Sequence, residues 1–299
     1  MPEMPEVQGL VDFLREKLLP SGAPPAVISD VEVLSFAVLK TADVPLDALQ
    51  TAPVSAVERR GKFIVLTAGG VLLVMHLAKA GWLRWSDALK PGRLRPGKGR
   101  LALRVRFARR EGAGSDGGAE PGFDLTEAGT KKSLAVYLVR DPADVPGIAR
   151  LGPEAFDVDF DTFAGLVAAH RGQIKGLLRD QSVIAGVGNA YSDEILHAAH
   201  LSPFATAAKL KPEEVSRLFQ ALRAVLESAN ANAAGRPAAE LKDSKRRAMR
   251  VHARTGEPCP VCGDTVREVS FADSSLQYCP TCQTGGKLLA DRRLSRLLK

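Results

Sequence analysis

The chain has 299 residues, of which 45% are hydrophobic, and it carries a formal net charge of +7. This length and apolar content predict two or three globular domains, each with a core of its own. No apolar run approaches the ~18 residues that a transmembrane helix needs, and the N-terminus lacks the cationic and apolar pattern of a signal peptide. These features exclude membrane-spanning and secreted classes and predict a cytoplasmic protein without a membrane partner.

The basic residues lie in three segments. Residues 90–110 hold nine Lys or Arg and no acid, residues 242–254 hold six with one acid, and the tail after Cys282 holds five with one acid. Clusters of this kind favour a polyanionic partner, most often a nucleic acid. The alternative is a basic face that only meets solvent.

The first half of the chain shows one helical pattern followed by strand patterns. Apolar residues at helical spacing predict a helix over 5–19, with Pro5 in its first turn. Two apolar runs around Gly69-Gly70 predict a β-hairpin over 62–78. Residues 101–107 alternate, which predicts a half-buried strand with Arg104 and Arg106 on an outer cationic face. The glycine-rich stretch 111–122 predicts a loop.

The second half is helical. An apolar stripe predicts a helix over 212–229. Upstream, "GVGN" at 186–189 predicts a glycine turn that opens a new helix near Asn189. Free N–H groups at such a helix start bind phosphate, and Asn189 either caps the helix or donates to a phosphate oxygen.

The four cysteines follow the pattern C-x2-C-x16-C-x2-C at Cys259, Cys262, Cys279 and Cys282. Two such knuckles supply the four thiolates of a tetrahedral zinc site. Because all four positions are protein ligands, the expected zinc is structural and leaves no place for a catalytic water.

Five motifs occur in order along nearly the whole chain: "MPEMPEV" at the start, "RRGKFIVL" at 59–66, "LGPEAF" at 151–156, "GVGNAYSDEIL" at 186–196 and "TGEPCPVCG…YCPTCQ" within 255–283. Together they resemble the formamidopyrimidine-DNA glycosylase/endonuclease VIII family of base-excision repair enzymes. The resemblance implies an α+β fold. It consists of an N-terminal β-sandwich flanked by helices (1–150), a domain with a helix–two-turn–helix motif (151–254), and a zinc finger with a basic tail (255–299).

The resemblance also implies a mechanism that begins at the second residue. Once Met1 is removed, Pro2 carries a secondary amine that attacks sugar C1′ of a flipped damaged or abasic nucleotide and forms an imine, followed by β/δ-elimination. With Met1 retained, the Pro2 nitrogen is an amide and cannot react in this way. Glu3 is the expected acid/base. Lys62, on the strand after Arg59-Arg60, binds a phosphate or assists catalysis, and Glu6 positions the lesion.

The expected partner is damaged DNA, whether duplex, abasic or single-stranded, bound by a monomer. Lys175 and Asn189 are expected to contact backbone phosphate. The sequence departs from the family where a Met, an Arg and an aromatic residue normally fill the gap left by the flipped base: an ungapped alignment puts Lys79, Ala143 and Val145 at these positions. Ser274 replaces the arginine that the finger normally carries. Arg250 and Arg254 are candidates to supply the missing charge.

Two alternatives to an enzyme remain. The first is a catalytically weak or silent protein that binds damaged DNA on the same fold, which the missing wedge and Ser274 favour. The second is a zinc-ribbon protein of transcription or translation, which has no use for a free N-terminal proline. The departures predict that strand cleavage at abasic sites exceeds excision of any named base, since an abasic site is already unstacked.

Overall fold

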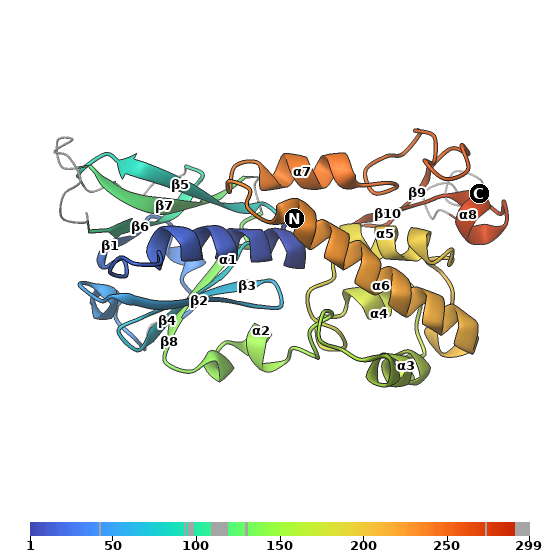
Figure 1. The fold of residues 1–299 in the computed structure, drawn as a ribbon, viewed down its shortest axis with the longest axis horizontal. Coiled ribbons are helices and arrows are strands. Elements are labelled where there is room, and N and C mark those ends of the chain that lie inside the picture. The colour runs from blue at the N-terminus through green and yellow to red at the C-terminus, as the bar shows by residue number, and fades with distance from the viewer. Residues whose placement is uncertain are drawn as a thin grey trace. The chain divides into compact units, whose positions relative to one another are not determined.

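The computed structural model describes residues 1–41, 43–92, 94, 99–108, 119–128, 131–272 and 274–290. The chain forms two compact units (Figure 1). Unit 1 comprises Met1–Arg150 with Ala233–Lys242, and unit 2 comprises Leu151–Asn232 with Asp243–Lys299. Among the described residues, no helix has both the length and the apolar character needed to cross a membrane.

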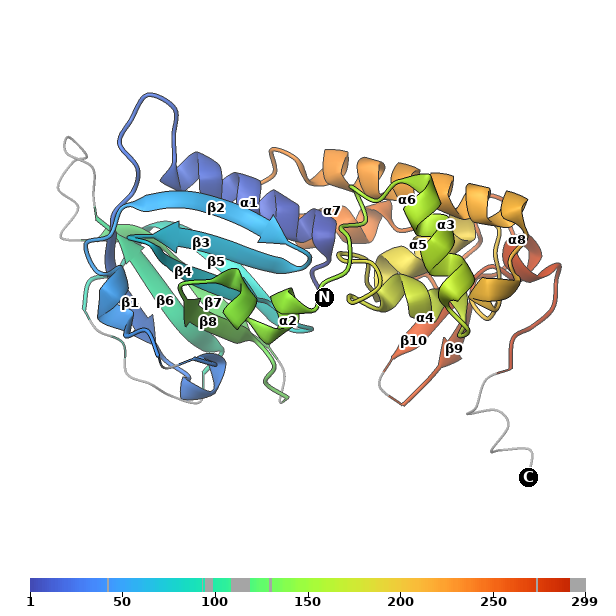
Figure 2. The ribbon, with the colours of Figure 1, turned by 90° about the horizontal axis from the view of Figure 1, so that it is seen from below.

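Unit 1 is a β-sandwich of two four-stranded antiparallel sheets, with strand orders β1-β6-β7-β5 and β2-β3-β4-β8 (Figure 2). The strands are β1 Ile28–Val33, β2 Val54–Arg60, β3 Phe63–Ala68, β4 Val71–His76, β5 Gly81–Leu89, β6 Leu101–Phe107, β7 Glu120–Glu127 and β8 Ala135–Val139. The helices are α1 Met4–Leu18 and the short α2 Pro146–Ala149, and 3-10 turns lie at Phe36–Val38, Leu46–Leu49 and Pro142–Asp144.

The core of unit 1 fills the space between the sheets and under α1. The apolar stripe of α1 (Val7, Leu10, Val11, Leu14 and Leu18) is buried against the inner faces of the strands. Helix α1 packs against β2 and β3. The predicted hairpin is confirmed: β3 and β4 pair in register from Phe63–His76 to Ala68–Val71, and Gly69 and Gly70 have the positive φ values that the tight turn requires.

Unit 2 is mainly helical and ends in a small β-hairpin. Its elements are α3 Phe160–Ala169, α4 Ile174–Arg179, α5 Asn189–Ala198, α6 Pro212–Ala233, α7 Leu241–Ala248, β9 Arg267–Ser270, β10 Ser275–Tyr278 and α8 Pro280–Thr284, with a 3-10 turn at Ala207–Lys209. The last residue of α6 and the first two of α7 fall within unit 1. The expected helix–turn–helix is formed by α4 and α5, and the predicted α+β fold is confirmed.

Two expectations for residues 101–122 are corrected. Arg104 forms a bidentate pair with Asp124, at 2.6 and 2.8 Å, and Arg106 is buried and lies 3.7 Å from Glu32. This part of β6 is therefore neutralised by acids on β7 and β1 and is not an exposed cationic face. Of the predicted loop 111–122, residues 120–122 begin β7, while residues 111–118 lie outside the described part of the chain.

Candidate active site and metal centre

The N-terminus of the chain is held by the first turn of α1. Glu3 is the N-cap residue of the helix, and its backbone N–H donates to Glu6 Oε2 at 2.8 Å, so the two residues form a capping box. Pro5 stands in the first turn, where its missing N–H costs nothing. Pro2, Glu3 and Glu6 are all buried, whereas Met1 is 48% exposed. The chain therefore fixes the backbone beside Pro2 and leaves the preceding methionine accessible.

Lys62 lies in the turn between β2 and β3, not on the strand as the sequence suggested. Gly61 takes the positive φ of that turn, and Lys62 is only 7% exposed. In both views the N-terminus of the chain lies beside this turn (Figures 1 and 2). The fold therefore brings the N-terminal segment and the turn that bears Lys62 to the same end of unit 1.

His76, the last residue of β4, was not identified from the sequence. It pairs with Phe63 across the sheet, and the two ring centroids are 4.7 Å apart. Burial, reinforced by the positive charge of Lys62, lowers the pKa of His76 to about 4. The imidazole is therefore neutral at physiological pH and offers one donor and one acceptor next to the lysine. A histidine that ends an apolar strand in "VLLVMH" was the available signal.

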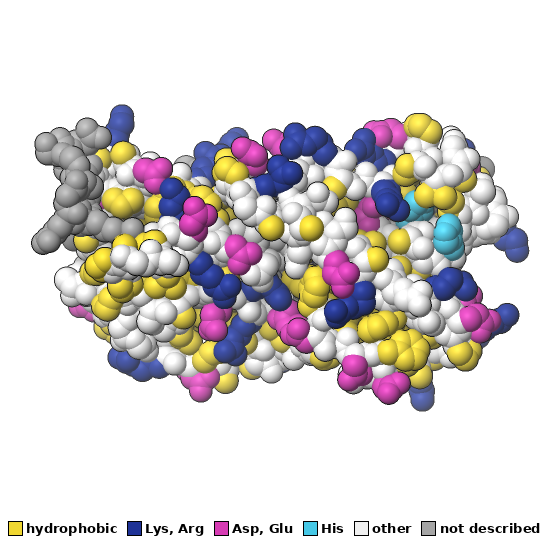
Figure 3. Space-filling view, viewed as in Figure 1, with side chains coloured by type: hydrophobic (Ala, Val, Ile, Leu, Met, Phe, Trp, Pro, Cys, Tyr) yellow, Lys and Arg dark blue, Asp and Glu magenta, His cyan; other side chains and the backbone are white. Residues whose placement is uncertain are grey.

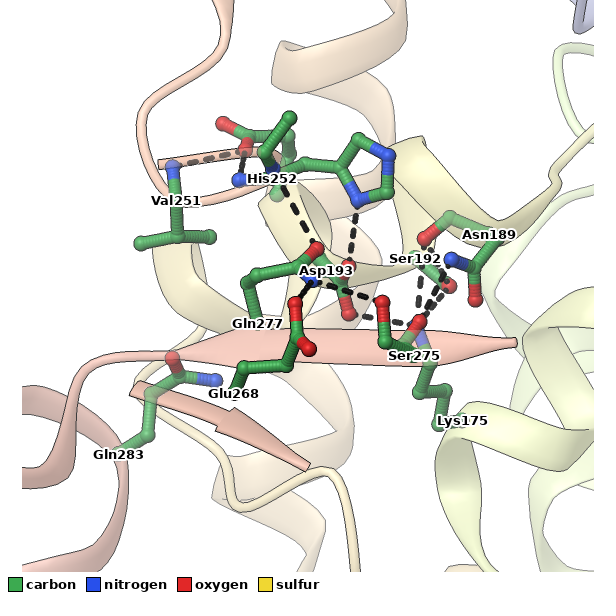
Figure 4. A network of polar contacts seen from close by, with 12 residues as sticks. Lys175, Asn189, Ser192, Asp193, Val251, His252, Glu268, Ser275, Gln277 and Gln283 are labelled. Carbon is green, nitrogen blue, oxygen red and sulfur yellow. Dashed lines mark hydrogen bonds and ion pairs between the residues drawn. The ribbon is translucent and has the colours of Figure 1, made fainter. Parts of the chain in front are cut away.

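In unit 2, Lys175 belongs to a buried polar network around Asp193 (Figure 4). Lys175 Nζ lies 2.5 Å from Asp193 Oδ1 and donates to Ser192 Oγ at 2.7 Å and to the backbone oxygen of Asn189 at 3.2 Å. The second oxygen of Asp193 lies 2.7 Å from His252 Nδ1. The ammonium group thus fastens α4 to the first turn of α5, and the sequence analysis missed Asp193 as its partner.

Asn189 connects the start of α5 to the finger hairpin. The N-cap of α5 is Gly188, so Asn189 is the first helical residue and not the cap. Its Nδ2 donates to the backbone oxygen of Ser275 on β10 at 2.8 Å. Gly186 has a φ of 105°, which is accessible to glycine, and its N–H donates to Gln181 Oε1. The glycine turn and the finger hairpin are therefore joined through Asn189.

Glu194, the next residue along α5 after Asp193, holds the loop that carries Arg250. Its two carboxylate oxygens accept from the backbone N–H groups of Arg250, Val251 and His252 at 2.8 to 2.9 Å. Burial raises the pKa of Glu194, and these three hydrogen bonds oppose the shift. The hydrogen bond to Glu194 fixes the backbone of Arg250, while the residue itself is exposed to solvent.

Arg254 is held by the finger itself. Its Nη1 donates to Glu257 Oε2 at 2.9 Å, and its Nη2 donates to the backbone oxygen of Arg246 at 3.4 Å. The Glu257 ion pair offsets part of the charge that the sequence analysis assigned to DNA. Because Arg254 is one-third exposed, its guanidinium still reaches solvent.

The four cysteines converge as their spacing predicted. Their Sγ atoms all lie within 4.8 Å of one another, with Cys262 to Cys279 at 3.3 Å and Cys259 to Cys282 at 3.9 Å. Tetrahedral Zn²⁺ with Zn–S bonds of ~2.3 Å needs S···S separations of roughly 3.8 Å, so the donor set and its size fit one structural zinc. The expected cofactor is confirmed.

A histidine outside the finger supports this zinc site. His197 Nε2 on α5 lies 3.3 Å from Cys259 Sγ, and both residues are buried. Burial, together with the charges of His200 and Arg250, lowers the pKa of His197 to about 4, so the ring is neutral. A neutral imidazole that donates from Nε2 hydrogen-bonds the thiolate and couples α5 to the metal centre.

Comparisons with known proteins place the chain in a family. The formamidopyrimidine-DNA glycosylase N-terminal domain matches residues 1–115, the H2TH domain of the same enzymes matches 151–238, and a zinc finger found in FPG and IleRS matches 256–285. A formamidopyrimidine-DNA glycosylase of Symbiobacterium thermophilum is 32% identical over 98% of this chain and 93% of its own length. This chain belongs to the formamidopyrimidine-DNA glycosylase family.

Two further proteins are similar to this chain to different degrees. A formamidopyrimidine-DNA glycosylase-like protein of Mycobacterium tuberculosis is 62% identical over 52% of this chain and 99% of its own length. A Lactococcus lactis Fpg, solved in complex with DNA that contains an abasic site, is 22% identical and superposes with a TM-score of 0.77, covering 95% of this chain and all of that one. At that identity the structural match shows the fold alone.

Lys79, Ala143 and Val145 stand at the positions where the family pattern has residues that fill the gap left by the flipped base. These three residues differ in exposure. Val145 is fully buried and follows the 3-10 turn at Pro142–Asp144, so a stacking role at this position is excluded by packing. Ala143 is exposed, and its N–H is capped by Asp141 Oδ1 at 2.8 Å. Lys79 is exposed on the loop before β5.

The finger hairpin carries an aromatic residue close to Ser274. The backbone N–H of Phe271 donates to the backbone oxygen of Ser274 at 2.8 Å, and Phe271 is 38% exposed. The finger therefore lacks the arginine of the family pattern and presents an accessible phenyl ring beside Ser274.

Proposed function

We propose that this protein is a DNA repair glycosylase with AP-lyase activity whose nucleophile is Pro2. The observation that carries the proposal is the N-terminal segment: the capping box fixes the backbone of Glu3, and the turn with Lys62 lies beside the N-terminus. The catalytic region is assigned to residues 1–150. The helical region (151–254) and the finger region (255–299) bind DNA. The family relationship supports this assignment.

The proposed reaction at an abasic site starts with removal of Met1. The Pro2 nitrogen adds to C1′ of the open sugar, which forms the C–N bond of a carbinolamine. Loss of the C1′ hydroxyl as water, with a proton supplied by an acid, leaves an iminium. Removal of a C2′ proton then drives out the 3′ phosphate, and a second elimination drives out the 5′ phosphate. Water finally hydrolyses the imine and frees Pro2.

The protein's own groups serve the proton transfers in this sequence. An α-amino group titrates near ~8, so part of it is neutral at working pH. Glu3 is the general acid/base because it is the carboxylate next to the nucleophile. Lys62 supplies positive charge for a phosphate near the reacting sugar, and the neutral ring of His76 beside it offers a second site for proton transfer.

The main alternative is a catalytically silent protein that binds damaged DNA. The buried Val145 and the small Ala143 favour it, because neither provides a surface that stacks in a base gap. Borohydride reduction distinguishes the two functions, since it converts a Pro2 iminium into a permanent protein–DNA adduct. We expect the processed protein to be trapped on abasic DNA and to release cleaved strand without borohydride.

A matched set of proteins makes this test specific. Pro2→Gly retains a primary amine and should be trapped more weakly. A preparation that quantitatively retains Met1 should be trapped far less than the processed form, because its free amine belongs to Met1 and the Pro2 nitrogen is an amide. Glu3→Gln should lose base excision more than lyase activity. Equal trapping of the Met1-retaining and processed forms would refute Pro2 as the nucleophile, and absence of any adduct from the processed form would favour the silent binder.

A further inference from the structure

Unit 1 contains a groove of about 680 Å³ that the proposed chemistry does not use. It is formed by the C-terminal half of α1, by strand β5 and by the segment 237–242. The N-cap residue Glu3 is ten positions from Phe13 in the groove, which corresponds to about 15 Å along a helix. The groove is therefore a separate feature from the N-terminal segment, although both use α1.

The groove is rich in aromatic rings. It is lined by Phe13, Trp82 and Trp85, and the chain has only two tryptophans, so both lie here. Trp85 stacks on Phe107 in the core and meets the edge of Phe13 at a centroid distance of 6.0 Å. Phe13 and Trp85 are partly exposed and are supported from behind by core packing, so their rings form rigid platforms for a flat ligand, whereas Trp82 is only 6% exposed and forms the floor of the groove.

Cationic side chains lie among these rings. Lys242 Nζ is 4.3 Å from the Trp82 ring centroid, and Lys17 Nζ lies 5.8 and 5.9 Å from the rings of Phe13 and Trp85. Arg84, exposed on β5, is the third cation of the lining. Over α1 and β5, Figure 3 shows dark-blue basic and magenta acidic side chains next to yellow hydrophobic ones.

One carboxylate in the lining sets the polarity of the groove. Asp87 Oδ1 accepts from Trp85 Nε1 at 2.7 Å and from Lys17 Nζ at 3.2 Å. The hydrogen bond from Trp85, followed by the ion pair with Lys17, holds the pKa of Asp87 below its usual value. Asp87 thus fixes the Trp85 ring and offsets one of the three cations, which leaves an excess of positive charge.

We propose that this groove binds a single-stranded segment of nucleic acid, with bases on the rings of Phe13 and Trp85 and phosphates on Arg84 and Lys242. Single-strand sites combine aromatic platforms with a cationic track, and this lining has both. The incoming bases displace the lysine side chains from the ring faces, and the ammonium groups then pair with phosphates. The groove thereby gives the protein a second contact with DNA, on the unit that carries Pro2.

An extended peptide is the competing occupant, because β5 is an edge strand and peptides can add to a free strand edge. The charge excess restricts such a peptide to an acidic one. The lining favours nucleic acid, since the partly exposed rings of Phe13 and Trp85 suit flat bases, and the net charge of +7 attracts polyanions. The experiment includes an acidic peptide for this reason.

Intrinsic tryptophan fluorescence tests the proposal directly, because both reporters lie in the groove. The zinc-loaded full chain is titrated with an undamaged oligothymidylate of about eight nucleotides at several salt concentrations. We expect saturable quenching whose affinity falls with salt. Lys242→Gln should lower the slope of log K against log salt by about 0.7, the value for one phosphate contact in a single strand.

The matched control is Lys209→Gln, which removes one exposed lysine from unit 2 and should leave the quenching unchanged. Trp82→Phe leaves the partly exposed Trp85 as the single reporter and should retain the quenching. Three results would overturn the proposal: anisotropy showing that labelled oligonucleotide binds without quenching, equal slopes for the two lysine variants, or stronger quenching by an acidic peptide. Because no adduct is formed, the outcome is independent of borohydride trapping at Pro2.

Discussion

At the scale of single residues, Glu6 is a positioning group for the N-terminus. The lesion contact expected from the sequence stays a prediction, and in the structure the Oε2 atom of Glu6 accepts from the backbone N–H of Glu3. This contact orients the residue that follows Pro2. The role that we infer requires a side-chain acceptor at the third helical position and does not require a negative charge.

Glu6→Gln and Glu6→Ala separate these roles. Gln still accepts from the N–H of Glu3, so Glu6→Gln should retain stability and most of the borohydride-trapped adduct. Glu6→Ala removes one side of the capping box and should cost about 1 kcal/mol of unfolding free energy together with a clear loss of adduct. A strong loss of adduct in Glu6→Gln, without loss of stability, would instead place the carboxylate on the substrate.

His76 should make the stability of the folded protein depend on pH. Its pKa is about 4 in the folded protein, below the ordinary histidine value of 6.5, because burial and Lys62 disfavour the imidazolium. Between these two values the unfolded chain binds a proton that the folded chain does not, so stability falls as pH falls from about 6.5 to 4. The full contribution is present above the unfolded pKa.

Urea denaturation at a series of pH values tests this expectation. The difference in unfolding free energy between wild type and His76→Gln should be constant above pH ~6.5 and should shift against wild type as pH falls toward ~4. Taking the difference between the two proteins removes the acid sensitivity of the shared zinc site. A difference that does not vary with pH would mean that His76 is not held neutral by the fold.

At the scale of elements, the Lys175–Asp193 pair fixes α4 against α5. The sequence predicted a phosphate contact at Lys175, and that role stays a prediction. The geometry shows a buried ammonium with three oxygen partners. Removing one member of a buried pair leaves an uncompensated charge, which costs about 3–5 kcal/mol.

Lys175→Met should therefore lower the unfolding free energy by about 3–5 kcal/mol, and Asp193→Asn should also destabilise the protein. Both effects are measured by denaturant unfolding of the zinc-loaded chain. A direct phosphate contact would have a different signature: stability close to wild type, with the slope of log K against log salt for duplex DNA reduced by about 0.9 in Lys175→Met. That result would contradict a structural role.

A second contact between structural elements joins α5 to the finger. His197 hydrogen-bonds Cys259 Sγ, and such partners of metal ligands typically contribute 10–100-fold to metal affinity. His197→Leu should weaken zinc binding by about that range in chelator competition. His197→Gln places an amide donor near Nε2 and should recover part of the loss, while His170→Gln serves as the control. Unchanged zinc affinity in His197→Leu would show that the contact is only packing.

At the scale of the whole molecule, the order of five motifs was sufficient to predict the α+β fold, the zinc finger and the family. Each motif is a short run of neighbouring residues, so it can be recognised in a single sequence. The parts that the sequence did not predict depend on partners far along the chain. Arg104 forms an ion pair with Asp124, and Lys175 forms one with Asp193. Glu6 accepts a hydrogen bond from the backbone of Glu3 in the capping box of α1. Charge counts cannot distinguish a paired cation from one that faces DNA.

Val145 illustrates the same limit. Ungapped alignment placed it where an aromatic wedge is expected, and the structure buries it completely. A Val145→Phe substitution would overpack this site, at a cost of ~1–3 kcal/mol, and would not restore a wedge. Any repair of the missing contacts must therefore use accessible positions, such as the half-buried Ser274 and the exposed Phe271 of the finger.

The residues that depart from the family pattern determine which substrates we expect the protein to process faster. Base–aromatic stacking is worth ~1–3 kcal/mol, so a missing stacking residue costs roughly tenfold to a hundredfold in holding a flipped base. This penalty falls on a lesion paired within a duplex and spares an abasic site, a bubble or a single strand, where unstacking is already complete. Cleavage at abasic and single-stranded substrates should therefore exceed excision of 8-oxoguanine opposite cytosine.

Single-turnover rates on matched substrates measure this order, and two variants test its cause. Ser274→Arg adds a cation at the finger turn and should raise the rate on the 8-oxoguanine duplex more than the rate on abasic single strands. Phe271→Ala should lower the duplex rate if the exposed ring already stacks beside the lesion, with Phe36→Ala as the matched control because Phe36 is a highly exposed phenylalanine of unit 1. If the unmodified protein instead prefers the 8-oxoguanine duplex, a working wedge exists at another exposed residue such as Lys79. The inference drawn from Ala143 and Val145 would then be wrong.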